Sequence, residues 1–402
     1  MSFTLEKKQT RAHPNRANGS TLIAKDAEEL TIVYNKFKSN RSSPRTESQI
    51  PLNLVFTHGN GFNKSVWTYI IKQLYKSSQS HQVPWHLDTV LAIDAIGHGD
   101  SNLANQGKLG CVYMWDDGSR DVLDVIKHER ETTGDMQNNF EGRTIAVGHS
   151  MGGYIALYAS YLEPTFFDAV VAIDPVIYRT DVSEERYFNS LKKLSRLMKD
   201  TFNTEQEARD YFEIHSFTKN FQSDVLQDYI TDEIYETKTE DGKVVYKFKC
   251  SSLNQLVAYL SRNVCAAKGM LALPSISVPI FHVVGAADIH NMREAVPWIR
   301  KAIRPDMLAG AINIEGGRHL VNSEQPDDVI KVIAEALTKR NREFNRERSN
   351  IPEIALNGEK KALFEQQRRH VLNFEMDKVY GYDTGAKYTP FDLYSKSSSS
   401  KL

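Results

Sequence analysis

The stretch Ile145-Ala-Val-Gly-His-Ser-Met-Gly-Gly-Tyr154 joins a short apolar run to a helix-forming run through the pattern G-x-S-x-G. We predict a strand, then a sharp turn at Ser150 and a helix that begins near Met151. Such a turn lifts the serine hydroxyl clear of its own backbone, and Gly148 and Gly152 let the strand and the helix approach closely. The first N–H groups of the helix would face the serine, where negative charge develops when a nucleophile attacks. The alternative is a glycine-rich turn with a solvated serine, since the pattern alone recurs by chance.

The composition is that of an ordinary globular protein, with 402 residues, 41% of them hydrophobic and 25% charged, and a net charge of -1. This balance gives no sign of a nucleic-acid partner. Three cysteines without a C-x-x-C pair indicate a reducing compartment and no metal site. No apolar run reaches the roughly 20 residues of a transmembrane helix, so we expect no transmembrane segment. The first residues lack the apolar core of a secretory signal.

We predict an α/β body that is interrupted by an inserted cap. The segment after residue 180 is polar, helical in period and rich in aromatic residues, with a loop or small hairpin at 238–248. The predicted segments are a disordered N-terminus (1–20), the first part of the α/β core (21–180), a helical cap (181–270), the second part of the core (271–340) and a charged C-terminal extension (341–402), partly helical around 359–376.

A second glycine-rich turn follows the predicted buried strand Leu52–Thr57, in the sequence His58-Gly-Asn-Gly61. In hydrolases built around a serine turn, the loop after this strand supplies one of two backbone donors to the developing oxyanion. We predict the backbone N–H groups of Asn60 and Met151 as these donors. The alternative is a strand-to-helix turn without a ligand.

The run Asp94-Ala-Ile-Gly-His-Gly-Asp-Ser101 follows another predicted strand. We interpret it as a packing device, in which Asp94 and Ser101 tie the loop and the glycines permit a tight backbone. His98 lies in this loop, and the loop pattern explains it better than a catalytic role does.

The predicted general base is His319, in the loop Gly316-Gly-Arg-His that follows the last predicted strand. It completes the chain order Ser…Asp…His of this type of triad. Two acids are candidates for the third member. Asp288 ends a G-x-x-D sequence after one strand, which we favour, and Asp174 ends the strand 169–174 and is the alternative.

Together these motifs, which span about residues 30–337, resemble the α/β-hydrolase superfamily. Within it the chain is similar to the fungal peroxisomal hydrolases of the yeast lipase type. The segments that carry this similarity are Asn53–Gly59, Asn102–Gly110 with Trp115–Gly118, Gly148–Gly153, Gly317–Asn322 and the C-terminal tripeptide. The resemblance implies a mostly parallel central sheet flanked by helices, with an inserted helical cap. It also implies a peroxisomal matrix enzyme that hydrolyses lipid esters with Ser150 and His319, without a metal or organic cofactor.

The last three residues are Ser400-Lys401-Leu402, the peroxisomal import address, which indicates an import receptor as a partner. Two functions compete with a lipase or esterase. The first is an acyl-CoA thioesterase, which uses the same nucleophile. The second is a binding or assembly protein on a hydrolase scaffold, an alternative that the charged tail suggests. That tail could also pack on the body or mediate a homodimer.

Overall fold

The computed structural model of the chain describes residues 2–41, 46, 48–80, 83–139, 142–179, 183–287, 292–349, 360–375 and 378. The chain divides into two compact units, Met1–Thr338 and Lys339–Leu402. In the second unit, helix α15 (Lys360–Leu372) confirms the partial helix predicted there. No helix in the described part of the chain is long and apolar enough to cross a membrane.

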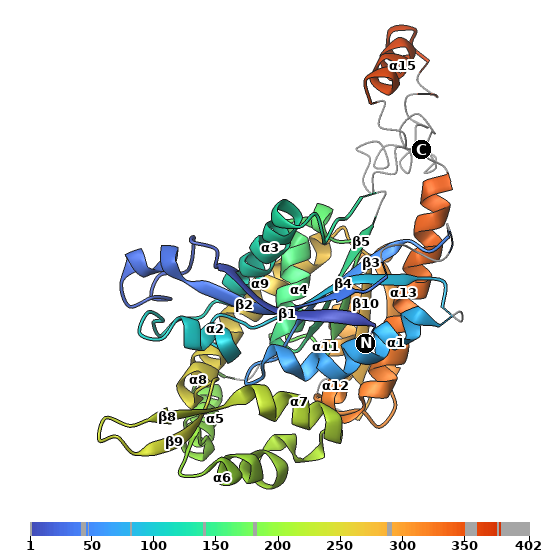
Figure 1. Ribbon diagram of the computed structural model, residues 1–402. Coiled ribbons are helices and arrows are strands. Elements are labelled where there is room, and N and C mark those ends of the chain that lie inside the picture. Colours follow the sequence, from blue (N-terminus) through green and yellow to red (C-terminus); the bar gives the residue numbers. More distant parts are fainter. Residues whose placement is uncertain are drawn as a thin grey trace. The chain divides into compact units, whose positions relative to one another are not determined.

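The first unit is built on an eight-stranded sheet with the strand order β1-β2-β4-β3-β5-β6-β10-β11 (Figure 1). β1 and β2 pair antiparallel, as do β2 and β4, and all other neighbours pair parallel. The strands are β1 (Phe3–Arg11), β2 (Thr31–Ser39), β3 (Pro51–Thr57), β4 (His86–Ile93), β5 (Arg143–His149), β6 (Ala169–Ile173), β10 (Ile280–Gly285) and β11 (Leu308–Ile314). This mostly parallel sheet with flanking helices confirms the predicted fold class.

Burial explains why the central strands read as continuous apolar runs. β5, β6 and β10 are buried at every position. A parallel strand that helices cover on both faces has no solvent side, so it lacks the polar alternation of an exposed strand. Side chains still alternate between the faces of the sheet. On one face, Val55 packs in the main core cluster with Val122 of α3 (Trp115–Thr132) and Ile155 of α4 (Met151–Leu162).

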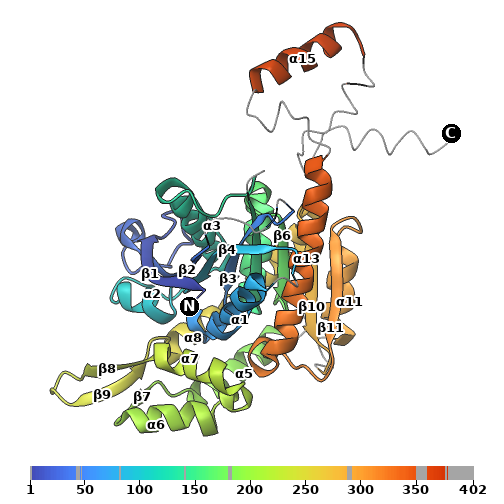
Figure 2. The ribbon, with the colours of Figure 1, turned by 45° about the vertical axis from the view of Figure 1, so that its right-hand side comes forward.

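Helices cover both faces of the sheet (Figures 1 and 2). One face carries α3 (Trp115–Thr132), α4 (Met151–Leu162) and α11 (Ala295–Ala302), whose apolar residues share the core cluster. The other face carries α1 (Thr68–Gln79) and residues 326–338 of α13 (Pro326–Ser349), the part of that helix in the first unit, and these two segments lie next to each other in both views.

The segment between β6 and β10 holds helices and a small sheet of its own with the strand order β7-β9-β8. Its elements are α5 (Glu184–Leu197), β7 (Thr201–Phe202), α6 (Glu205–Asp210), α7 (Ser223–Glu233), β8 (Ile234–Lys238), β9 (Val244–Phe248), α8 (Ser252–Leu260) and α9 (Arg262–Ala272). β8 and β9 pair antiparallel, so the hairpin alternative for 238–248 is confirmed. We call this segment, residues 183–272, the insert.

The expected disorder of residues 1–20 is wrong. Phe3–Arg11 forms the edge strand β1, which pairs with β2 along its whole length. The run is polar because only Phe3 is buried, against the rings of Phe37 and Tyr75. An edge strand obtains its stability from backbone hydrogen bonds to its neighbour and needs few apolar side chains, so it leaves little trace in a hydrophobicity pattern.

Candidate active site

Ser150 occupies the turn between β5 and α4, with φ 55° and ψ -116°. Positive φ is costly for a residue other than glycine, and such strain is typical of a serine held out for reaction. The flanking glycines have the predicted packing role. A side chain at Gly148 would overlap the backbone of Gly152, and one at Gly152 would overlap the backbone of Thr57.

The structure brings Ser150 and His319 together. The Nε2 atom of His319 lies 3.0 Å from the Oγ atom of Ser150, although 169 positions separate them. His319 comes from the loop between β11 and the short helix α12 (Val321–Glu324). Gly316 takes φ 69° in this loop, which allows the backbone to turn directly after the strand. A serine hydroxyl can therefore pass its proton to this imidazole.

The structure describes one of the two candidate acids. Asp288 lies outside the described residues. Asp174 is buried at the end of β6 with φ 41°, and its Oδ2 atom accepts a hydrogen bond of 2.8 Å from the backbone N–H of Gly285. That bond ties the ends of β6 and β10 together.

The predicted oxyanion loop, which we define as His58–Asn63, follows β3 directly. The side chain of Asn60 is held from two sides: its Nδ2 donates to the carbonyl of Gln255 at 2.9 Å, and its Oδ1 lies 3.0 Å from Nε2 of His98. Met151 is the first residue of α4, so its N–H has no partner within the helix. The roles of both backbone N–H groups as donors stay predictions.

His98 is a support for the oxyanion loop. Its ring is fully buried, and burial lowers its pKa well below the ordinary value, so it is neutral. The predicted tie of the same loop is confirmed: the Oγ atom of Ser101 donates to the carbonyl of Asp94 at 3.1 Å and accepts from the N–H of Val33 at 2.8 Å.

Sequence reasoning missed Lys64, whose side chain is fully buried next to the oxyanion loop. Its Nζ atom contacts Asp94 at 2.8 Å, Asp100 at 2.8 Å and Asp232 at 2.9 Å. Burial alone would lower the pKa of Lys64, but these carboxylates raise it, so the amine stays charged. Since Asp232 belongs to α7, a buried ionic cluster joins the body to the insert. Asp94 and Asp100 lie in the loop motif already described, but Lys64 and Asp232 leave no local sequence signal.

Glu233, the neighbour of Asp232 on α7, was also missed. Its Oε2 accepts from Nδ2 of Asn63 at 2.8 Å, and its Oε1 accepts from the backbone N–H of Cys250 at 2.7 Å. Burial raises the pKa of the Glu233 carboxyl to about 8, against the effect of these two hydrogen bonds. Tyr229, one turn earlier, donates its hydroxyl to the carbonyl of Gly61 at 2.9 Å. The oxyanion loop is thus held by side chains of the insert.

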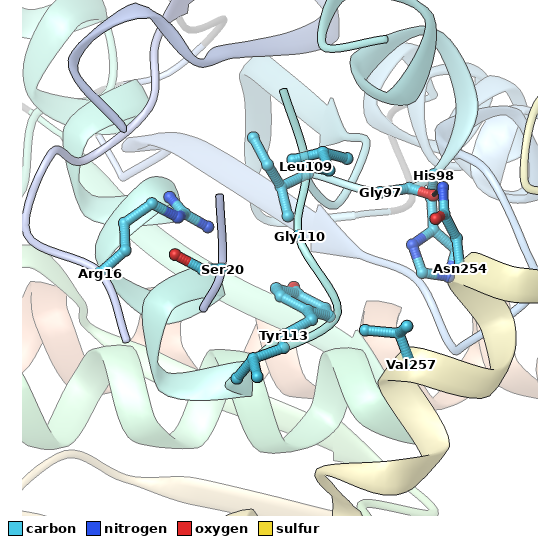
Figure 3. Close-up of a pocket in the computed structure, with 11 residues that line it drawn as sticks. Arg16, Ser20, Gly97, His98, Leu109, Gly110, Tyr113, Asn254 and Val257 are labelled. Atoms are coloured by element: carbon cyan, nitrogen blue, oxygen red, sulfur yellow. Dashed lines mark hydrogen bonds between the residues drawn. The ribbon is translucent and has the colours of Figure 1, made fainter. Parts of the chain in front are cut away.

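A small pocket lies between the N-terminal segment and the insert, with Arg16 and Ser20 on one side and His98 and Asn254 on the other (Figure 3). It offers only about 20 Å³ to the centre of a water molecule. By this measure roughly 10–15 Å³ holds one water molecule, so the pocket has room for about one. We therefore do not assign the acyl group of a substrate to this pocket.

The cysteines are free thiols, of which Cys111 is exposed and Cys250 and Cys265 are buried. Burial raises the pKa of the Cys265 thiol to about 12 and that of Cys250 well above its ordinary value. A protonated, buried thiol is a poor nucleophile. The described residues contain no group of three or more His, Cys, Asp or Glu side chains that could hold a metal ion.

Comparisons with known proteins agree with this fold. Residues 54–332 match the model of the alpha/beta hydrolase family. The "Peroxisomal membrane protein LPX1" of Saccharomyces cerevisiae is 31% identical over 382 residues, which cover 90% of this chain and 94% of that protein. The crystal structure described as the peroxisomal alpha-beta-hydrolase Lpx1 of the same yeast matches with a TM-score of 0.75 and 29% identity over 92% of this chain and 98% of that one.

Another relative is a type I acyl-CoA thioesterase of Penicillium brevicompactum. It is 26% identical over 166 residues, but these cover only 41% of this chain and 35% of the thioesterase.

Proposed function

We propose, from the premise that this chain belongs to the α/β-hydrolase family, that it cleaves carboxylic esters of lipids through an acyl-enzyme formed on Ser150. The observation that carries the proposal is the 3.0 Å contact between Ser150 Oγ and His319 Nε2 at a strained strand-to-helix turn.

The reaction proceeds in two steps. His319 takes the proton of Ser150 while Oγ attacks the ester carbonyl, and it then gives this proton to the departing alcohol. A water molecule that His319 activates in the same way releases the acid. The backbone N–H groups of Met151 and Asn60 stabilise the oxyanion of each tetrahedral intermediate.

A carboxylate completes the triad, because the imidazolium that forms at His319 needs an anion and a fixed tautomer. We assign this role to Asp288, which follows β10 in the chain. Asp174 is the alternative. The hydrogen bond that it accepts from Gly285 favours a structural task for it.

Apolar surfaces near the site support a lipid substrate. The ring of Phe62, in the oxyanion loop, lies within 5.8 Å (centroid to centroid) of the rings of Phe217, Phe221 and Tyr229 from the insert. Phe217 is about half exposed, so this ring cluster beside the oxyanion loop keeps apolar surface in contact with water.

A second function, acyl-CoA thioesterase, is favoured by the partial similarity to the Penicillium enzyme. Thioester cleavage would use the same serine, histidine and oxyanion donors. Helix α5 exposes Lys192, Lys193 and Arg196, cations of the kind that bind the phosphates of CoA.

The peroxisome is the proposed compartment. Its support is the similarity to the yeast peroxisomal protein and the sequence Ser400-Lys401-Leu402. Microscopy of an N-terminal fluorescent fusion, with and without these three residues, tests whether they direct import into peroxisomes. A fusion that reaches peroxisomes equally well without them would contradict it.

The activity is tested with p-nitrophenyl esters of short to long acyl chains, with acyl-CoA substrates measured in parallel. We expect turnover of medium or long esters and labelling of Ser150 by a fluorophosphonate. In Ser150→Ala, kcat should fall by about 10⁴-fold or more, because the nucleophile is absent.

Ser160→Ala is the matched control, since Ser160 is a buried serine of α4, the helix that follows Ser150, and its hydroxyl donates to the carbonyl of Leu157. It should keep the wild-type kcat. Turnover of acyl-CoA alone would identify a thioesterase. If neither substrate reacts and no serine is labelled, the chain is a binding protein on a hydrolase scaffold.

A further inference from the structure

His149, the residue that precedes the serine, has no part in the chemistry described above. We propose that His149 is a positioning residue, which holds the backbone of His319 so that the His319 imidazole stays in reach of Ser150. This inference rests on the proposed serine-hydrolase function. Its central observation is the 2.7 Å hydrogen bond between Nε2 of His149 and the carbonyl oxygen of His319.

The direction of this bond follows from its acceptor. A carbonyl oxygen can only accept, so Nε2 of His149 carries the hydrogen and Nδ1 does not. The ring is fully buried, and burial lowers the pKa of His149 to about 3, with the nearby His319 acting in the same direction. His149 is therefore neutral at physiological pH, and its donor is permanently available.

The consecutive residues His149 and Ser150 thus hold His319 at two points. Ser150 Oγ meets the ring of His319 at 3.0 Å, while the His149 ring holds the His319 carbonyl at 2.7 Å. One contact alone would leave the imidazole free to tilt about it. Two contacts from the same dipeptide fix both the position and the orientation of the ring relative to the nucleophile.

The opposite edge of the His149 ring abuts the oxyanion loop. A Cβ atom at Gly59 would lie 3.0 Å from Nδ1 of His149, and the ring of Phe62 lies 6.2 Å from the His149 ring (centroid to centroid). Nδ1 is buried and has no hydrogen-bond partner among the described residues. The imidazole therefore stands between the loop that carries the base and the loop that carries a predicted oxyanion donor.

This placement matters because His319 lies on a short loop and not within a regular element. Only six residues separate the end of β11 at Ile314 from the start of α12 at Val321. A displacement of a catalytic group by about 1 Å can cost on the order of 10²-fold in rate. A side chain that fixes this backbone is thus expected to affect the chemical step more than substrate binding.

Two substitutions separate the hydrogen bond from the volume of the ring. His149→Phe keeps a flat ring but has no donor, and His149→Gln places an amide N–H₂ close to the position of Nε2. We expect kcat for a p-nitrophenyl ester to fall roughly 10- to 100-fold in His149→Phe, with KM within about twofold of the wild type. His149→Gln should recover kcat to within about fivefold. The rate of fluorophosphonate labelling of Ser150 should follow kcat.

His282→Phe is the matched control. His282 is another buried imidazole whose pKa burial lowers to about 3, and it lies in β10, where its Nδ1 accepts from Nε of Arg300 at 3.2 Å. Its loss should leave kcat unchanged after correction for the folded fraction from thermal melts. If His149→Phe does not fold, His149→Asn replaces it, since its shorter amide does not reach the carbonyl.

The inference is overturned if His149→Phe keeps the wild-type kcat, or if folded His149→Gln is as slow as His149→Phe. A wild-type enzyme that neither turns over ester nor is labelled would instead contradict the proposed function itself.

Discussion

At the scale of single residues, Ser150 is a strained point of the described site. Its backbone conformation costs about 1–3 kcal/mol for a residue with a side chain. Three backbone hydrogen bonds offset this cost: the N–H of Ser150 donates to Ile173 at 3.0 Å, and its carbonyl accepts from Tyr154 at 3.2 Å and from Val176 at 3.1 Å. The strain is therefore held by β6 and α4 together, and the hydroxyl keeps its exposed position.

The triad acid yields a prediction at the same scale. Asp288→Asn should lower kcat by about 10³- to 10⁴-fold with little change in melting temperature, because the imidazolium at His319 loses its anion. Asp174→Asn should lower kcat by less than about tenfold, since its side-chain oxygen can still accept from Gly285. The measurement is kcat at saturating ester, with a thermal melt of each variant. The reverse ranking would assign the role to Asp174.

The sequence predicts those residues of the site that sit in a local motif. Ser150 follows from G-x-S-x-G, and His319 follows from its glycine-rich loop and its place in the chain order. His149 and Lys64 could not be predicted in the same way. The partner of His149 lies 170 positions away, and one partner of Lys64 lies 168 positions away. Only the folded chain brings such pairs together.

At the scale of elements, two ion pairs tie α7 of the insert to the body. Asp232 joins the cluster of Lys64, and Asp228, one turn earlier, pairs with Lys72 of α1 at 3.1 Å. The two lysines differ in burial: the side chain of Lys64 is 0% exposed and that of Lys72 is 49% exposed.

This contrast predicts different costs for two similar substitutions. Lys64→Met should lower the free energy of unfolding by about 3–5 kcal/mol, because it leaves the fully buried carboxylate of Asp94 without a counter-charge. Lys72→Met should cost at most about 1 kcal/mol, since water already screens that pair. Urea denaturation of both variants measures the difference. Equal losses would mean that the buried cluster contributes no more than a surface ion pair.

Elements were predictable where burial dictates composition. β3, β5, β6 and β10 appear as apolar runs because helices cover both faces of the sheet. β1 escaped prediction because its stability comes from backbone pairing with β2, which polar side chains do not disturb. The three-stranded sheet of the insert was likewise predicted only as a hairpin, since β7 adds just two residues.

At the scale of the whole molecule, Glu233 makes stability depend on pH. Its pKa is about 8 in the folded protein and 4.5 for the unperturbed group. Between these values the unfolded chain releases a proton that the folded chain retains, so rising pH favours unfolding. Glu233 should therefore contribute a loss of about 1.4 kcal/mol per pH unit between pH 4.5 and 8, and no change outside this window.

Glu233→Gln removes this dependence. The stability of the wild type relative to this variant should fall steadily in urea denaturation experiments from pH 5 to pH 8. Glu129→Gln serves as a control. Burial would raise the pKa of Glu129, but hydrogen bonds from Lys36, Lys8 and Tyr34 lower it to about 2. Its difference from the wild type should therefore be constant over the same range. A constant difference for Glu233→Gln as well would show that Glu233 is ionised in the folded protein.

The contacts of the insert with the oxyanion loop also have a consequence during synthesis of the protein on the ribosome. Ribosomes add roughly 5–20 residues per second, so Asn63 and Lys64 emerge about 10–30 s before Glu233 and Asp232 arrive to meet them. During that interval the lysine has to remain in water, and the loop is without the side chains that shape it. Under the proposed mechanism, the nascent chain therefore stays inactive until Glu233 has been made, and His319 after it.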